Sequence, residues 1–547
     1  ALQAKGASQA AKTVYSPIAG VRNFLSGVFL TLANGNIMRG MPFSDSFRLT
    51  AGKAANLADD EFRRLYELTG NLGLRDQNIS VNEFRRLMQD GSELKAAGTT
   101  AGGLQKLKDR IPFANALERV YSGTDTFWKI TNWNAERAKY ANAFRSAGLA
   151  PDAIDQIGDA LVRSGLAPRT SEITGTAGFL DTLAGDIVKN TQPTYSRVPE
   201  GIKRLRRIPV AGNFVAFPAE VMRNTANIVD RGLREMSFKA APELVQQIGE
   251  QAARRLEREV RAIGAQRLSG YMASAIAIPT GIQMTAKEIL GWDDQQMEDL
   301  QKQLPYYMDG TQVVPITPAG DPNIEYINLS YMMPYDFALA PARAALQIYN
   351  EQGAVGTGEA EQIRAATFAG LGKLLEPFAS ESLLGERILN VTTRNGLSPT
   401  GQQIYTENSP FSEKMSRSIN HVLGGLSPGV ADLFVQERSG RITPGRVTRA
   451  VTGVPSPSGQ PFDLYEEAGA LVSGLRPMQV RLPETFRYKG FEYNQADRDA
   501  ANIFGRVANA NDSSEQDILD AYRTANERSM RAQAQLYDLV QSARRLG

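Results

Sequence analysis

Apolar residues recur every three or four positions over most of the chain, the spacing that places them on one face of an α-helix. The last segment shows this most clearly, because from residue 518 onward the apolar positions alternate spacings of four and three. This predicts a long C-terminal helix with a heptad seam, diluted by serine and alanine. The seam could pack on its own chain or in a bundle between chains. Its larger members are Ile518, Tyr522, Leu536, Leu539 and Leu546.

Two stretches depart from the helical pattern. Residues 311–316 (TQVVPI) and 324–330 (IEYINLS) are rich in β-forming residues and are separated by seven residues, which predicts a β-hairpin. Residues 376–487 contain many glycines and prolines and only short helical runs, so we expect an extended, loop-rich stretch that needs a neighbour. The pattern as a whole predicts an all-α, elongated, multi-helix protein with one small β-hairpin.

The length of 547 residues exceeds what one hydrophobic core supports, so we expect several structural units. Composition and pattern suggest five regions. They are residues 1–103 with amphipathic and short helices, 104–310 as a central helical region, 311–375 with the hairpin and following helices, 376–487 as the loop-rich stretch, and 488–547 with the long C-terminal helix.

The formal net charge of +2 hides blocks of opposite sign. Residues 197–267 hold 14 basic and 8 acidic residues, whereas residues 287–336 hold 2 basic and 9 acidic residues. Such blocks fit either stacked copies or one self-complementary monomer. The densest basic run is a candidate contact for DNA phosphates or an acidic partner, although a solvated helix face or turn is favoured because phosphate-binding tracts are longer. It comprises Lys203, Arg204, Arg206 and Arg207.

Residues 268–286 form an uncharged run of 19 residues that is a candidate for membrane contact. The length approaches that of a bilayer-spanning helix. A proline, a glycine and a glutamine interrupt the run, however, which favours a core helix and leaves insertion after unpacking as the alternative. The apolar residues singled out for this contact are Leu268, Ile276, Ile278 and Ile282.

Residue types that carry chemistry are scarce. The chain has no cysteine and one histidine, His421, which excludes disulfides and thiolate sites and most zinc sites. The acidic run at residues 293–299 opens a predicted helix, where acids complement the helix dipole. Glu381 precedes a serine, as in some peptidoglycan-cleaving enzymes, but the following residues lack the rest of that pattern. We therefore predict no catalytic, cofactor or metal site, and no enzymatic activity.

Three segments carry a resemblance to a known family. Residues 124–140 (TDTFWKITNWNAERAKY), 217–236 (FPAEVMRNTANIVDRGLREM) and 321–337 (DPNIEYINLSYMMPYDF) resemble, in this order, segments of the large internal virion proteins of podovirus-type bacteriophages. No catalytic residue is attached to these segments. The resemblance implies a structural protein of the virion interior that is ejected with the genome and helps to form a DNA-translocation conduit across the host envelope.

The resemblance also implies partners: further copies of the chain, other core, portal or tail proteins, genomic double-stranded DNA, and the host membrane during ejection. Two alternatives remain open within the phage interpretation, namely a peptidoglycan-cleaving enzyme module and a scaffold fragment of a larger polyprotein. A cellular, membrane-associated helical protein is a third.

Overall fold

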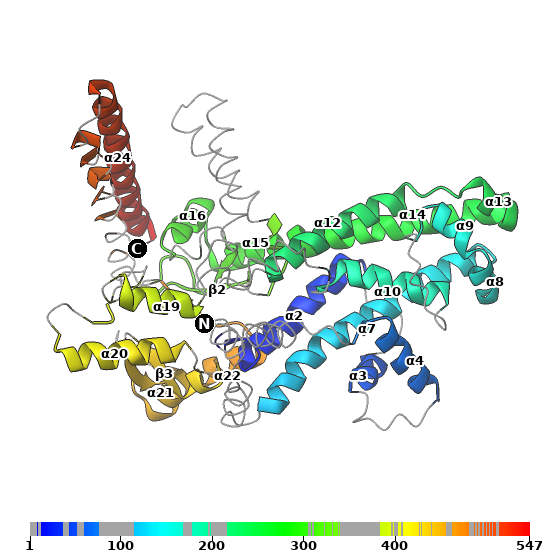
Figure 1. The fold of residues 1–547 in the computed structure, drawn as a ribbon, viewed down its shortest axis with the longest axis horizontal. Coiled ribbons are helices and arrows are strands. Elements are labelled where there is room, and N and C mark those ends of the chain that lie inside the picture. Colours follow the sequence, from blue (N-terminus) through cyan, green and yellow to red (C-terminus); the bar gives the residue numbers. More distant parts are fainter. Residues whose placement is uncertain are drawn as a thin grey trace, which may run out of the picture.

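The computed structural model describes residues 12–36, 43–51, 60–75, 114–167, 178–194, 216–304 and 514–546, most of 308–339 and 383–480, and parts of 486–509, together with positions 8 and 197. The predicted basic run at 203–207 lies outside the described residues. The described chain is predominantly helical, as the sequence predicts. Figure 1 shows the helices spread along one long axis, with α13 at one end and α20 and α24 at the other.

The N-terminal and central helices follow the apolar spacing. They are α2 (Pro17–Ala33), α3 (Phe43–Ala51), α4 (Asp60–Asn71), α7 (Ala114–Ser146), α8 (Pro151–Gln156), α9 (Gly158–Arg163), α10 (Phe179–Thr191), α12 (Ala216–Met236), α13 (Pro242–Ile248), α14 (Glu250–Met272), the π-helical turn η3 (Ala273–Ala277), α15 (Ile278–Leu290) and α16 (Asp294–Lys302). Local signals set several boundaries. Ser16 caps α2, where its hydroxyl accepts from the amide of Ala19, and Pro17 occupies the first turn.

Helices α2, α7, α12 and α14 pack against one another in the centre of the molecule (Figure 1). Glycines allow the close approach of their backbones. A Cβ atom on Gly264 of α14 would lie 2.6 Å from the amide nitrogen of Met236 and 2.7 Å from the carbonyl oxygen of Gly232, both on α12. A Cβ atom on Gly270 would lie 2.2 Å from the carbonyl oxygen of Leu32 on α2. Helix α14 therefore contacts two neighbours almost backbone to backbone.

Apolar clusters pack on α7 next to this crossing. One cluster joins the end of α7 to α8, α9, α10, α13 and α14, and includes Phe144, Leu161 and Leu256. A second cluster holds α4 against α7 and α10 around Trp133, whose indole N–H donates to the carbonyl of Asp181 at 3.1 Å. Together they fix the orientation of α7 on its neighbours.

The hairpin predicted at 311–330 is confirmed. Strands β1 (Val313–Pro315) and β2 (Glu325–Asn328) pair antiparallel, with Val314 opposite Ile327. A short third strand, β5 (Met478–Gln479), pairs with β2 and was not predicted. This sheet packs on α16 through a cluster that also takes in Leu546.

The region 376–487 contains more structure than the sequence led us to expect. It holds α19 (Leu383–Thr392), α20 (Phe411–Gly424), the 3-10 turn η5 (Ala431–Leu433), the hairpin strands β3 (Val435–Arg438) and β4 (Arg441–Pro444), α21 (Arg446–Thr452) and α22 (Leu464–Ser473). The second hairpin was missed because its strands are short and mix charged with apolar residues. Gly440, at φ 74°, supplies the left-handed turn position between the strands.

The long C-terminal helix is confirmed as α24 (Glu515–Leu546). Its predicted seam packs on its own chain at the C-terminal end, where Leu539 and Leu546 are buried. Gln303, directly after α16, donates to Ser542 at 2.6 Å, and Arg545 binds Asp299 through two hydrogen bonds of 2.6 and 2.7 Å. Of the other seam residues, Ile518 and Leu536 are half-buried and Tyr522 is exposed, with its ring beside Phe504.

The close approach of α14 and α12 predicts that Gly264→Ala lowers the free energy of unfolding by about 1–3 kcal/mol, because an added methyl group meets main-chain atoms that cannot yield. Gly20→Ala is the matched control, since no atom lies within 4 Å of a Cβ at this position of α2. There we expect unchanged or slightly higher stability. Urea unfolding followed by circular dichroism measures both; equal midpoints would contradict the prediction.

Candidate functional site

The candidate membrane segment lies along the end of α14, η3 and α15. Leu268 and Ile278 are half-buried, whereas Ile276 and Ile282 are exposed. The side that faces inward packs on α2, and the hydroxyl of Ser274 donates to the carbonyl of Phe29 at 2.8 Å. Among the described helices, none has both the length and the apolar character needed to span a bilayer.

A buried polar cluster lies where α2, α7, α12 and α14 cross, and Arg267 of α14 is at its centre with no exposed surface. Its guanidinium donates to both carboxylate oxygens of Glu136 at 2.9 and 2.8 Å. It also donates to both oxygens of Glu235 at 3.0 and 3.1 Å, and to the side-chain oxygen of Asn34 at 2.9 Å. These five contacts engage every N–H-bearing nitrogen of the guanidinium, so its desolvation is offset by charge-assisted hydrogen bonds.

Further polar side chains surround these residues and complete the cluster. Arg231 donates to Glu235 and to the hydroxyl oxygen of Tyr140, at 2.6 Å each, and that hydroxyl itself donates to Glu235. Lys139 donates to the main-chain carbonyl of Asn34 at 2.7 Å. We call these seven residues the central network: Asn34, Glu136, Lys139, Tyr140, Arg231, Glu235 and Arg267.

Burial and neighbouring charges shift the pKa values of the residues in the central network. Burial disfavours the ionised carboxylate of Glu235, but Arg267 and Arg231 outweigh it and lower its pKa to about 2. Burial lowers the pKa of Lys139 to about 8, against the opposing attraction of Glu136. Burial also raises the pKa of Tyr140, which keeps the phenol neutral as a hydrogen-bond donor. Near neutral pH the carboxylates are therefore ionised and paired.

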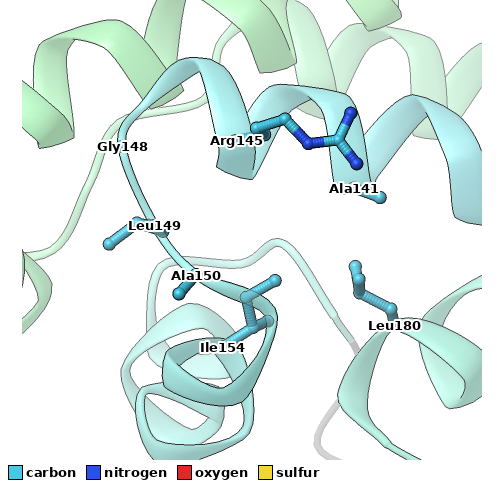
Figure 2. Close-up of a pocket in the computed structure, with 7 residues that line it drawn as sticks. All are labelled: Ala141, Arg145, Gly148, Leu149, Ala150, Ile154 and Leu180. Carbon is cyan, nitrogen blue, oxygen red and sulfur yellow. The ribbon is translucent and has the colours of Figure 1, made fainter.

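This arrangement suits structural stabilisation rather than chemistry. A reactive acid or base needs access to a substrate, and the charged groups here already bind one another inside packed helices. The pocket drawn in Figure 2, of about 350 Å³, lies elsewhere, between the end of α7, α8 and α10. Apart from Arg145 its labelled side chains are apolar, so its lining offers no acid–base pair. Over the described ranges, no three His, Cys, Asp or Glu residues cluster so as to hold a metal ion.

A second polar contact involves Glu220, the last residue of the FPAE sequence at residues 217–220. Arg223 donates to Glu220 at 2.6 and 2.8 Å and to the carbonyls of Lys189, Asn190 and Gln192 at 3.1–3.2 Å. Those carbonyls lie at the C-terminal end of α10, where the last main-chain acceptors of a helix have no partner within the helix. Glu220 and Arg223 thus join α12 to the C-terminus of α10.

The other polar candidates also have structural partners. Asp293 caps α16 in a capping box with Gln296, and Asp299 binds Arg545. His421 lies on α20 with its Nδ1 atom 3.3 Å from Glu437. These contacts agree with the interpretation of the acidic run as a helix start.

The central network was not predicted from the sequence. Its charged members lie on helix faces that are otherwise apolar. From one sequence alone, it is not possible to tell whether such a charged residue is buried against a distant partner or exposed to solvent. The signal that existed was the resemblance, because Glu136, Lys139 and Tyr140 fall in residues 124–140, and Arg231 and Glu235 fall in residues 217–236. Neither protein-family models, nor curated proteins, nor solved structures match the chain.

Arg267→Met is expected to lower the free energy of unfolding by about 3–5 kcal/mol, because it leaves two buried carboxylates without their main partner. Arg254→Met, on the same helix, breaks an exposed pair with Glu250 and should cost less than about 1 kcal/mol. Denaturant unfolding of both variants separates the cases. Similar losses of unfolding free energy in the two variants would mean that the buried ion pairs of Arg267 contribute no more to stability than an exposed pair.

Lys139 gives a pH prediction. Its pKa is about 8 in the folded chain against 10.5 ordinarily, so between these values the unfolded chain binds more protons. Stability from this group must then rise as the pH increases from 8 to 10.5. We expect the difference between wild type and Lys139→Met, measured as free energy of unfolding against pH, to slope in this window. Parallel profiles would contradict the lowered pKa of Lys139.

Proposed function

We propose that this chain is a structural, non-enzymatic internal virion protein of a bacteriophage, ejected with the genome and contributing to a DNA-translocation conduit across the host envelope. The observation that carries the proposal is the convergence of the three segments on which the resemblance rests. They are far apart in the sequence, and yet each contacts another in the folded chain.

The first two segments meet in the central network. Glu136 of residues 124–140 shares the guanidinium of Arg267 with Glu235 of residues 217–236, and Tyr140 binds both Arg231 and Glu235. The contacts are buried and specific in geometry. Segments that resemble the same family in the same order therefore also form one packed unit.

The third segment joins them through apolar packing. Tyr335 is buried in a cluster with Ile228 of α12 and Leu30 of α2. Its ring meets Tyr271 of α14 edge-on, with the ring centres 5.3 Å apart. Tyr335 thus anchors the hairpin exit on α2, α12 and α14, three of the four helices that meet in the central network.

A mechanical role fits the distribution of polar groups. The buried charges are consumed in holding helices together, and the long helices provide surfaces for neighbours rather than a reactive centre. On this proposal the partners are further copies of the chain, other core, portal or tail proteins, genomic DNA and, during ejection, the host membrane. The chain would reside in the virion interior and then in the host envelope.

The test uses intact particles of the phage that encodes the chain. Mass spectrometry should find the chain in purified particles, where the capsid protects it from added protease. It should leave the particles when DNA ejection is triggered, while the major capsid protein, as the internal control, stays behind.

Three outcomes would overturn the proposal. The chain could be missing from particles, or it could be digested by protease in intact ones. A purified full chain that clears peptidoglycan in a zymogram would instead establish the enzyme module.

A further inference from the structure

The long helix α24 carries an exposed apolar stripe along most of its length. Figure 1 shows the helix projecting from the rest of the described chain, which it joins at its C-terminal end, where it packs on α16. Leu519, Tyr522, Met530 and Tyr537 are 47%, 58%, 61% and 67% exposed. At about 100° per residue, these four positions lie within an arc of about 80° around the helix axis. They therefore form one continuous stripe.

The chain itself covers a different side of α24. Ala525, Leu539 and Leu546 are buried, and their positions are turned away from the middle of the stripe by roughly 100–160°. The described parts of residues 486–509 reach one edge of the stripe, where the ring centre of Phe504 lies 5.9 Å from that of Tyr522. The stripe is thus an apolar surface that its own chain leaves exposed.

Polar residues on the same side of α24 are arranged symmetrically about the midpoint between residues 529 and 530. Glu515 and Arg544 lie at the two ends, equally far from this midpoint, and both are exposed. Among the described residues neither has an ion-pair partner. Asn526 and Gln533 lie closer to the midpoint, again at equal distances, and are also exposed. We call these four residues together with the apolar stripe the α24 face.

We propose that two copies of this chain pair through the α24 face, with the two helices antiparallel about a twofold axis at its midpoint. Glu515 of each copy then lies beside Arg544 of the other, at both ends of the contact. A parallel pair would place Glu515 beside Glu515 and Arg544 beside Arg544, so the charges favour the antiparallel arrangement. Because both copies use the same surface, the contact forms a closed dimer.

The aromatic residues and the shape of the molecule fit the same arrangement. Tyr522 of one copy lies level with Tyr537 of the other, and Met530 meets its own counterpart near the twofold axis. The bulk of each copy joins α24 at its C-terminal end (Figure 1). The antiparallel pair therefore keeps the two bodies at opposite ends, whereas a parallel pair would bring them together at one end.

The middle of the α24 face favours a second copy over a lipid surface. The amides of Asn526 and Gln533 interrupt the apolar stripe, and in a membrane they would lack hydrogen-bond partners. In the antiparallel pair Asn526 of one copy lies level with Gln533 of the other, so amide can bind amide. Gln533 has this capacity, since it uses one N–H for the hydroxyl of Tyr493 and keeps its oxygen. A polar pair of this kind also fixes the register of two helices.

The test uses cysteine cross-linking of the full chain, which contains no cysteine of its own. Asn526→Cys and Gln533→Cys are made in separate chains. Under mild oxidation an equimolar mixture should cross-link the two variants, because a disulfide forms only between positions that face each other closely. Neither variant alone should cross-link to itself. Met530→Cys alone should do so, because this position lies next to the twofold axis.

Thr524→Cys mixed with Gln535→Cys is the matched control. Both residues are exposed. They too lie level with each other in the antiparallel pair, but on the opposite side of α24 from the α24 face. This mixture should not cross-link, and a cross-link formed as fast as that between positions 526 and 533 would indicate random collision.

Sedimentation velocity measures the strength of the pairing. The unaltered chain should form dimers and nothing larger through this face. Met530→Gln with Tyr537→Gln should raise the Kd roughly a hundredfold, because each change enters the interface twice. Phe411→Gln with Met415→Gln, at exposed apolar positions of α20, should leave the dimer unchanged. Both variants should melt as the unaltered chain does when followed by circular dichroism.

The charges at the two ends have a test of their own. Glu515→Arg alone and Arg544→Glu alone should each weaken the dimer severalfold, because each places like charges together at both ends. An equimolar mixture of these two variants should recover the affinity of the unaltered chain, since every end then pairs an arginine with a glutamate. Unchanged affinity in both single variants would contradict the antiparallel arrangement.

Three further results would overturn the inference. They are a chain that stays monomeric at tens of micromolar, self-cross-linking of Asn526→Cys as fast as in the mixture, and loss of the dimer in the α20 variant. Vesicle binding that depends on Met530 and Tyr537, without self-association, would assign the α24 face to a membrane. The inference deepens the proposed function by naming one partner as a second copy. Because it is tested on purified chain, its failure leaves the proposed location in the virion untouched.

Discussion

The fold depends on one buried guanidinium. Arg267 binds two carboxylates from two other helices and an amide oxygen from a third, so α2, α7, α12 and α14 have to meet at this point and in this register. Displacing α7, α12 or α14 would leave a charge buried without its partner, which costs several kcal/mol. Displacing α2 would remove the Asn34 oxygen that accepts from Arg267. Gly264 and Gly270 lie three residues on either side of Arg267 on α14, and they are the positions where the neighbouring backbones come closest. The two glycines allow the helices to approach closely, and the hydrogen bonds of Arg267 fix their relative positions.

The features predicted from the sequence are those set by local pattern. The hairpin at 311–330 and the helix at 515–546 follow from residue spacing and turn composition within a short stretch. In the central network Arg267 binds Glu235, Glu136 and Asn34, which are 32, 131 and 233 residues away in the sequence. Such pairs cannot be predicted from a single sequence. A charged residue on a helix has the same local sequence pattern whether it is exposed to solvent or buried against a carboxylate that is distant in the sequence.

Helix α20 shows the opposite difficulty. Its apolar spacing predicts a helix over this stretch, and that helix forms, but spacing cannot tell which side the rest of the chain covers. The covered side is the polar one, because Asn420 donates to the carbonyl of Gly440 in the hairpin turn and His421 lies against Glu437. The hairpin itself was missed, so the inverted orientation of α20 could not have been expected.

Buried charged residues have different structural roles in the central network and in the region around Glu437 and Glu467. In the centre, Arg267, Glu136 and Glu235 are enclosed on all sides, and their ionisation serves the geometry of the four helices. In the other part, the buried carboxylates of Glu437 and Glu467 accept from partly exposed arginines and so join short helices and a hairpin; these arginines are Arg387, Arg446 and Arg476. These polar contacts hold α20 by one side, and its apolar residues Phe411, Met415, Ile419 and Leu423 stay exposed on the other. The fold of this part of the chain therefore does not depend on burying them.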